Sequence, residues 1–192
     1  MTFLSIAQPP LHRVGGNLAL DFANTVSWRG TANETDHIAT CEGLVRWAEE
    51  GGLLDGAIAR PALGEQCLAI ALTLRAAIRS VMEAALDGRD AAADRAVLLA
   101  LLRDALSSAR LAGTPAQLCF ADPCDRITGG VARAAVDLLR DERIARLKMC
   151  PRDDCHWLFL DLSKNGSRRW CAMESCGNRA KIEQHRRRHK GR

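Results

Sequence analysis

Four of the eight cysteines in this sequence form two short loops with identical spacing. Four residues separate Cys150 from Cys155, four separate Cys171 from Cys176, and fifteen lie between the two pairs. Zn²⁺ prefers soft ligands in a tetrahedron, and two such loops would supply four thiolates to one ion. Four protein ligands leave no open position for a substrate. We therefore predict one structural Zn²⁺ per chain, held by these four cysteines.

Two other ligand sets compete with this one. Cys119 and Cys124 have the same spacing and could join the first cysteine pair. Alternatively, His185 and His189 could join the second pair in a site of two cysteines and two histidines, since they lie one helical turn apart. Both alternatives stay open at the level of sequence.

The segment around the cysteines predicts a treble-clef-like zinc finger. Residues 156–161 are strand-like, residues 164–167 carry an Asn-Gly turn signal, and residues 168–170 would return as the second strand. Residues 178–190 are polar and compatible with a helix, and Ile182 is their one strong apolar anchor. The histidines of this helix would then pack against the hairpin. So small a module has too few large apolar residues for a core, and zinc would stabilise it.

Positive charge is concentrated at the C-terminal end. Ten Lys and Arg and two Glu lie between residues 163 and 192, a net charge of +8, which leaves −4 for the rest of a chain whose total is +4. A basic end on an acidic body is typical of a polyanion-binding appendage, and we predict DNA as its partner. The candidate DNA-contacting residues are Lys164, Arg168, Arg169, Arg179, Lys181, Arg186, Arg187, Arg188 and Lys190.

Some of these cations could serve the zinc site instead. Zn²⁺ with four thiolates carries a net charge of −2, which nearby cations would neutralise. Arg169 and Arg179 are candidates for that structural role, and Arg168 could also support the cluster. Arg186 to Arg188 lie two to three helical turns beyond the last cysteine, where phosphates are their natural partners.

A second candidate site lies near the N-terminus. Asp21, Asn24, Thr25 and Arg29 fall within nine residues. On a helix the first three share a face, and together with Arg29 they could bind a small polar ligand. The competing interpretation is that Asp21 caps a helix while Asn24 and Thr25 bind backbone groups. We find no nucleophile–base pair, phosphate loop or open metal site, so we predict that the protein is not an enzyme.

The elements that must position these residues are mostly helical. Amphipathic helices are expected at about 64–86, 90–111 and 128–147, and a further one capped by Asp36 or Thr40 and stopped at Gly51. Minor strand content is expected at 117–120 and in a short hairpin over 11–20. We predict a mainly α domain with minor β (α+β) over residues 1–147, followed by the finger over 148–192.

Two sequence motifs carry a resemblance to known families. The knuckle and hairpin from Cys150, RRWCAM at 168–173 and CGNR at 176–179 resemble the CGNR zinc finger over about 150–188. The run GGNLALDFANTV at 15–26, followed by Arg29, is similar to the opening of the ABATE domain, which precedes that finger in the family. The resemblance implies a stress-responsive transcription regulator whose N-terminal domain binds an unidentified ligand.

The composition of the chain indicates the cellular compartment in which the protein acts. Residues 1–10 carry no positive charge or long apolar run, and no apolar stretch approaches a membrane span, so we expect a cytoplasmic protein without membrane contact. In that compartment reduced thiols are favoured over disulfides, and Cys41 and Cys67 are expected as small core residues. We predict a DNA-binding regulator. Two alternatives are an enzyme acting on a small polar molecule with a docking finger, and an RNA-associated zinc protein.

Overall fold

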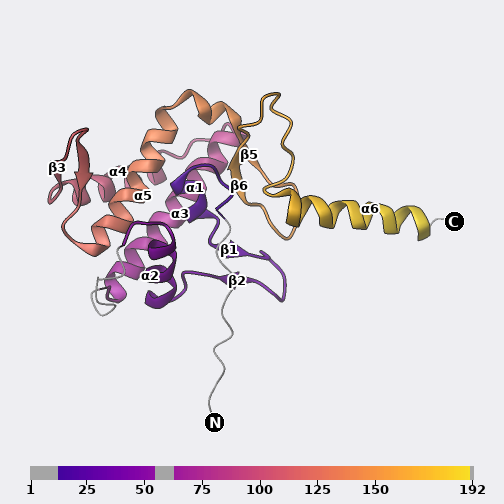
Figure 1. Ribbon diagram of the computed structural model, residues 1–192, viewed down its shortest axis with the longest axis horizontal. Helices are drawn as coiled ribbons and strands as arrows, with labels where there is room; N and C mark the ends of the chain where they lie inside the picture. The colour runs from indigo at the N-terminus through magenta and orange to yellow at the C-terminus, as the bar shows by residue number, and fades with distance from the viewer. Residues whose placement is uncertain (1–12, 55–62, 191–192) are drawn as a thin grey trace, which may run out of the picture.

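The computed structural model describes residues 13–54 and 63–190. The expectation for residues 1–10 and the first two residues of the predicted hairpin lie outside this range. The helices and strands of the described residues, shown in Figure 1, are α1 (Leu18–Ala23), β1 (Val26–Ser27), β2 (Thr35–Asp36), α2 (Cys41–Glu50), α3 (Glu65–Asp87), α4 (Ala92–Leu106), β3 (Arg110–Ala112), β4 (Gln117–Cys119), α5 (Pro123–Arg140), η2 (Glu142–Arg146), β5 (Leu147–Met149), β6 (Leu158–Leu160), η3 (Met173–Gly177) and α6 (Asn178–Lys190).

Helices dominate, which confirms the predicted α+β class. Within residues 13–54 and 63–190, the strands pair as three separate antiparallel hairpins, β1 with β2, β3 with β4 and β5 with β6. Helix α3 is the long amphipathic helix expected from the sequence, and Gly88 ends it with φ +69°. No helix of the described residues is both long and apolar enough to cross a membrane.

One hydrophobic core joins the helical body to the finger. Helices α1, α3 and α5 pack against one another, and α4 packs on α3 and α5. The same core contains Leu147 of β5 and Leu158 and Leu160 of β6, all buried. Packing therefore crosses the predicted boundary at residue 147.

Close packing of α4 on α5 depends on a glycine. A Cβ added at Gly129 would lie 2.7 Å from the Cβ of Ala105 and 2.9 Å from the ring of Phe120. Any side chain at this position would force α4 away from α5, and such overpacking costs about 1–3 kcal/mol.

Three of the predicted elements differ from those observed. Residues 13–20 form no hairpin, because the Asn17 side chain accepts the backbone N–H of Ala19 at 2.8 Å and starts α1. Helix α4 ends at Leu106, since the chain reverses there into β3 and β4. Helix α5 begins at Pro123 rather than near residue 128, because Asp122 caps it and proline suits the first turn. It ends at Arg140 rather than near residue 147, since the short helix η2 and strand β5 follow there.

The cysteines outside the finger also depart from expectation. Cys67 at the start of α3 and Cys124 at the start of α5 form a disulfide, with their Cα atoms 5.7 Å apart. Cys67 is buried as predicted, yet it is oxidised rather than reduced. The physical reason is that α3 and α5 are neighbours in the core, which brings two cysteines distant in the sequence into bonding range.

Candidate metal centre and nucleic-acid interface

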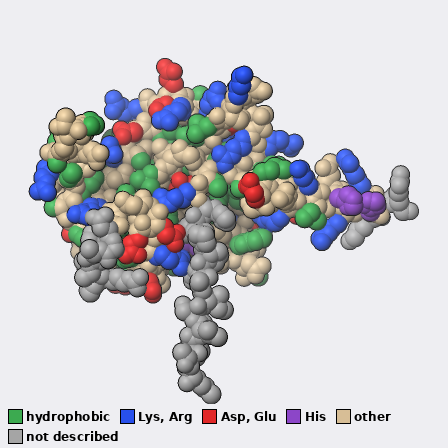
Figure 2. Space-filling view, in the orientation of Figure 1, with side chains coloured by type: hydrophobic (Ala, Val, Ile, Leu, Met, Phe, Trp, Pro, Cys, Tyr) green, Lys and Arg blue, Asp and Glu red, His purple; other side chains and the backbone are tan. Residues whose placement is uncertain are grey.

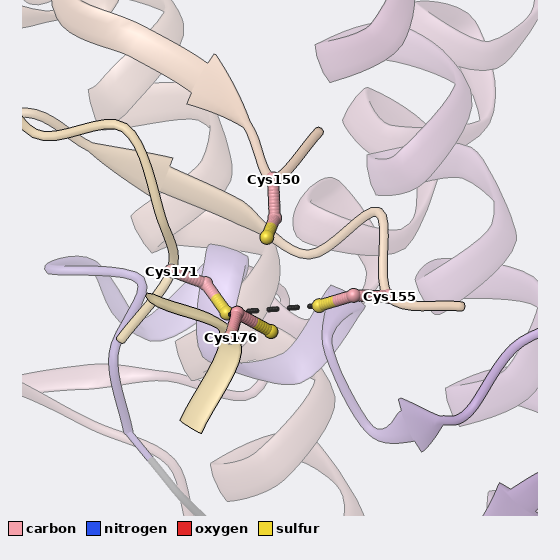
Figure 3. Close-up of side chains that lie close together, drawn as sticks. All are labelled: Cys150, Cys155, Cys171 and Cys176. Atoms are coloured by element: carbon pink, nitrogen blue, oxygen red, sulfur yellow. Dashed lines mark hydrogen bonds between the residues drawn. The ribbon is translucent and has the colours of Figure 1, made fainter. Parts of the chain in front are cut away.

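The four finger cysteines converge on one point. Their Sγ atoms all lie within 4.8 Å of one another, and all four side chains are buried. Figure 3 shows the side chains pointing toward a common centre from two separate loops. Cys150 and Cys155 flank the turn that joins β5 to β6, and Cys171 and Cys176 flank the start of η3.

The spacing of the sulfurs fits Zn²⁺. The Sγ atom of Cys171 lies 3.6 Å from that of Cys155 and 3.5 Å from that of Cys176. Tetrahedral thiolates at Zn–S bonds of about 2.3 Å lie about 3.8 Å apart. None of the four is in a disulfide. Four buried sulfurs leave no open coordination position, so the cluster fits one structural Zn²⁺.

The close spacing of the four sulfurs favours a bound cation. The pKa of Cys176 lies well below that of an ordinary thiol, because Cys150, Cys155 and Cys171 hydrogen-bond to its sulfur. Hydrogen bonds with Cys150, Cys155 and Cys176 raise the pKa of Cys171 far above its usual value. Four thiolates this close would repel one another, which restricts the ionisation of all four together. A bound Zn²⁺ removes this restriction by stabilising all four anions.

Arg179 balances the negative charge at the edge of the cluster. It donates to the Sγ atom of Cys176 at 3.3 Å and to the carboxylate of Asp154 at 2.5 Å. Its guanidinium also stacks on the ring of Trp28, 4.2 Å from the centroid. These contacts match the charge-neutralising role considered from the sequence and leave this guanidinium already engaged with protein groups.

The second knuckle is tightly packed around Gly177. A Cβ at this position would lie 2.5 Å from the Sδ of Met173 and 3.2 Å from the ring of Trp170. Because Gly177 has no side chain, η3 can pack directly against the indole of Trp170.

The order of elements is that of a treble clef, but one strand pairing differs from the prediction. Strand β6 pairs with β5, which precedes the first cysteine, and not with residues 168–170. Residues 161–170 instead form a loop held by the carboxylate of Asp161, which accepts from the Lys148 ammonium at 2.6 Å and the Arg168 N–H at 2.9 Å. The Lys148 contact, followed by that of Ser163, holds the pKa of Asp161 well below its usual range.

Comparison with known families agrees with this geometry. Residues 16–142 match the ABATE family model, described as "Putative stress-induced transcription regulator", and residues 146–189 match the CGNR zinc finger. The chain belongs to the ABATE family. A search of curated proteins found no match.

The basic side chains of the CGNR finger lie mostly on its outer surface. Helix α6 leaves the body and extends away from it (Figure 1), and Figure 2 shows Lys and Arg side chains along this helix, with His near its far end. The exposed candidates for DNA contact are Lys164, Arg169, Lys181, Arg186, Arg187 and Arg188. The Lys190 side chain lies outside the described part of the structure.

Arg168 has a different position from the one expected of a DNA contact. Its guanidinium donates to the carbonyls of Val14 at 2.7 Å and Leu160 at 3.2 Å, and to the Cys171 carbonyl. It also covers the ring of Phe159, 4.4 Å from the centroid. Arg168 therefore ties the finger to the residues that precede α1, and its donors face protein carbonyls rather than solvent.

The histidines and Ile182 of α6 do not pack on the hairpin as predicted. Ile182 is 52% exposed, and the imidazoles of His185 and His189 are exposed with their Nε2 atoms 3.2 Å apart. The physical reason is that α6 projects beyond the finger, so its later turns have no hairpin to contact. Neither histidine belongs to the metal cluster, and nor does Cys119 or Cys124.

The ABATE opening motif has mostly backbone partners. The carboxylate of Asp21 accepts the Gly15 N–H at 2.7 Å, and the hydroxyl of Thr25 donates to the Phe22 carbonyl at 2.9 Å. Asn24 is buried and pairs with the backbone of Leu158. The structure therefore does not gather the predicted ligand-binding residues in one pocket, because local capping and the contact with β6 engage three of them.

Arg29 is the exception, and its neighbours are arginines that the sequence analysis did not single out. It lines a cavity with Arg75 and Arg79 of α3. Arg75 also donates to the Thr25 hydroxyl at 3.1 Å, so the motif touches this cavity indirectly. The spacing of Arg75 and Arg79, four residues apart on an amphipathic helix, could have indicated that they share a face. No local pattern indicated that Arg29 would lie opposite them.

Proposed function

We propose that this chain is a cytoplasmic transcription regulator in which the finger, residues 148–192, binds DNA and the domain over residues 1–147 responds to a small ligand. The description of the matching family model, "Putative stress-induced transcription regulator", agrees with this proposal. The observation that carries it is the exposed row of cations on α6, held away from the body beside a structural zinc site.

The charges along α6 favour a polyanion. Arg186, Arg187 and Arg188 are exposed, and the nearest acidic residue on the helix, Glu183, is engaged by Arg152 at 2.9 Å. An exposed cluster of like charges repels itself and is stabilised when phosphates approach. The acidic character of the remaining chain, −4 in net charge, directs the nucleic acid to the finger.

Two of the predicted cations bind protein groups, so fewer side chains are left as candidate DNA contacts. Arg168 and Arg179 are engaged by carbonyls, a carboxylate and the thiolate cluster, so we exclude them from the phosphate contacts. Six exposed cations remain among the described candidates: Lys164, Arg169, Lys181, Arg186, Arg187 and Arg188. Neutralising about six phosphates gives a salt slope of roughly −5, or about a thousandfold loss of affinity between 50 and 200 mM salt.

The test is a salt titration of fluorescence anisotropy with random and genomic duplexes on zinc-loaded protein. Replacing Arg186, Arg187 and Arg188 by alanine should flatten the slope by about 2 to 3. Arg133→Ala, a change to an exposed arginine of α5, is the matched control and should leave the slope unchanged. Competition with structured RNA tests the RNA-associated alternative. A wild-type protein that ignores duplex DNA at 50 mM salt would refute DNA binding.

A further inference from the structure

An arginine-rich cavity lies where the helical body meets the finger. Its volume is about 690 Å³, and its lining includes Arg29 from the segment after β1, Arg75, Arg79 and Glu83 from α3, and Arg89 just beyond that helix. We call it the arginine cavity. Four guanidinium groups and one carboxylate make its wall strongly positive.

Nearby carboxylates compensate only part of this charge. Asp36 accepts two hydrogen bonds from Arg75, each of 2.6 Å, and Glu83 accepts one from the Nε of Arg79 at 2.7 Å. Arg29 has no ion pair among the described residues, and its one hydrogen bond, to the Ala23 carbonyl, is 3.5 Å long. Among the four cavity arginines, this guanidinium is the one for which the described residues supply no ion-pair partner.

Two donors on the cavity arginines have no partner at all. The Nε of Arg29 and the Nη1 of Arg79 are buried from solvent and form no hydrogen bond within the described structure. The side chains of Arg75 and Arg79 are 15% and 14% exposed. Buried donors without acceptors are costly, and cations removed from water next to one another cost more.

The electrostatics of Arg29 agree with this geometry. Burial lowers its pKa below the ordinary arginine value, and the charges of Arg79 and Arg75 lower it further. Nearby Glu34 and Glu83 act in the opposite direction but do not cancel the effect. An anion placed among these arginines would restore the balance.

We propose that the arginine cavity binds a small molecule bearing an oxyanion, either a carboxylate or a phosphate. Guanidinium groups match both oxyanions with paired N–H donors, which a lysine ammonium does not. A cavity of about 690 Å³ is within the size range of small-molecule sites and larger than a single ion needs. This oxyanion would be the small ligand to which residues 1–147 respond. Only the regulatory effect of binding rests on the proposed function, and binding itself does not.

The position of the arginine cavity connects it to the zinc site. His156, the residue after Cys155, lines the cavity and has φ +53°. Val26 also lines it, and its carbonyl accepts the indole N–H of the next finger residue, Trp157, at 2.7 Å. A molecule bound there would lie against the segment that holds the first zinc knuckle.

Isothermal titration calorimetry of the full-length, zinc-loaded protein tests this proposal. The probes are inorganic phosphate and malonate, which separate the two oxyanion sources, with chloride as the control anion. We expect saturable binding of at least one probe, and at least a tenfold loss of affinity in Arg29→Gln and in Arg79→Gln. Arg133→Gln and the alanine triple variant at residues 186–188 should bind as wild type. Thermal unfolding of each variant checks that the loss does not come from misfolding.

The possible outcomes separate this proposal from DNA binding. A protein that binds duplex DNA but neither oxyanion would overturn the cavity proposal and leave the DNA role standing. A protein that binds an oxyanion in the cavity but no DNA would refute DNA binding and leave the cavity proposal standing. If the alanine triple variant abolishes oxyanion binding while Arg29→Gln preserves it, the anion is on α6 and the proposal is wrong. Weaker DNA binding in Arg29→Gln, without oxyanion uptake by wild type, would assign the cavity to the DNA surface.

Discussion

The carboxamide of Asn24 pairs with both backbone groups of Leu158, 134 residues further along the chain. Its Nδ2 donates to the Leu158 carbonyl at 2.8 Å, and its Oδ1 accepts the Leu158 N–H at 2.8 Å. Asn24 is 2% exposed and Leu158 is fully buried. The side chain thus acts as an additional strand residue along β6 and connects the ABATE opening motif to the zinc finger.

Asn24→Ala should destabilise the protein strongly. The substitution leaves the Leu158 N–H and carbonyl buried without partners, and each unsatisfied group costs about 1–3 kcal/mol, so we expect a total loss of about 2–6 kcal/mol. Urea unfolding in excess zinc measures it. Asn33→Ala, at an exposed position of the β1–β2 loop, is the control and should change stability by less than about 0.5 kcal/mol. A loss as small as the control's in Asn24→Ala would show that the pairing contributes little.

Arg168 and Arg169 should separate structural from DNA-contacting cations. Arg168→Ala removes several charge-assisted hydrogen bonds to carbonyls of Val14, Leu160 and Cys171, and we expect a loss of about 2–4 kcal/mol in unfolding free energy. Arg168→Lys should rescue little of it, because an ammonium cannot reproduce the planar set of donors.

Arg169→Ala is the matched comparison for Arg168→Ala. Its side chain is exposed, so stability should change by less than about 0.5 kcal/mol while DNA affinity falls. Thermal unfolding and anisotropy on the same preparations give both readings. Equal stability losses in the two variants would contradict the assignment of Arg168 as a structural residue.

The zinc ligands are tested by elemental analysis. The double change Cys171→Ser and Cys176→Ser should eliminate the one Zn²⁺ expected per chain, because two hydroxyls cannot replace two thiolates. Cys119→Ser should retain zinc, as should the double change His185→Gln and His189→Gln. Undiminished zinc in the cysteine variant, or zinc loss in either control, would assign the ion to another ligand set.

Stability should depend on pH through His37. Burial lowers the pKa of this imidazole below its ordinary value of 6.5, and the charge of Arg46 contributes. The folded protein therefore binds this proton less readily than the unfolded chain. The contribution of His37 to stability is complete above the unfolded pKa and is lost as the pH falls through 6.5.

Urea unfolding between pH 7.5 and 5.5 tests this direction. Wild type should lose more stability over that range than His37→Gln, whose amide can still hydrogen-bond to the Ser27 hydroxyl, now 2.9 Å from the imidazole Nε2. Parallel pH profiles of the two proteins would show that His37 does not titrate differently on folding.

The type of metal site in the finger could be predicted from local sequence patterns. Two cysteine loops of equal spacing are a local pattern that predicts a zinc site. A third cysteine pair with the same spacing, Cys119 and Cys124, and the histidines of the last helix left other ligand sets open until the fold excluded them. The basic C-terminal end and the amphipathic period of α3 are likewise local, so charge and hydrophobic spacing predicted both. Caps at Thr40 and Gly88 follow from residue types next to the helix ends.

Tertiary structure decided which polar residues hold the protein together and which face solvent. Arg168 and Arg186 look alike in sequence, but one is enclosed by carbonyls of the finger and the N-terminal segment, while the other lies on a projecting helix. The sequence places Asn24 on a helix, and its pairing with Leu158 forms only in the folded protein. Arg29 and Arg79 line the same cavity although they belong to different elements. Such pairs are separated by 50 to 154 residues in the sequence. They meet because the apolar surfaces of distant elements pack into one core, and local sequence propensity does not predict contacts of that kind.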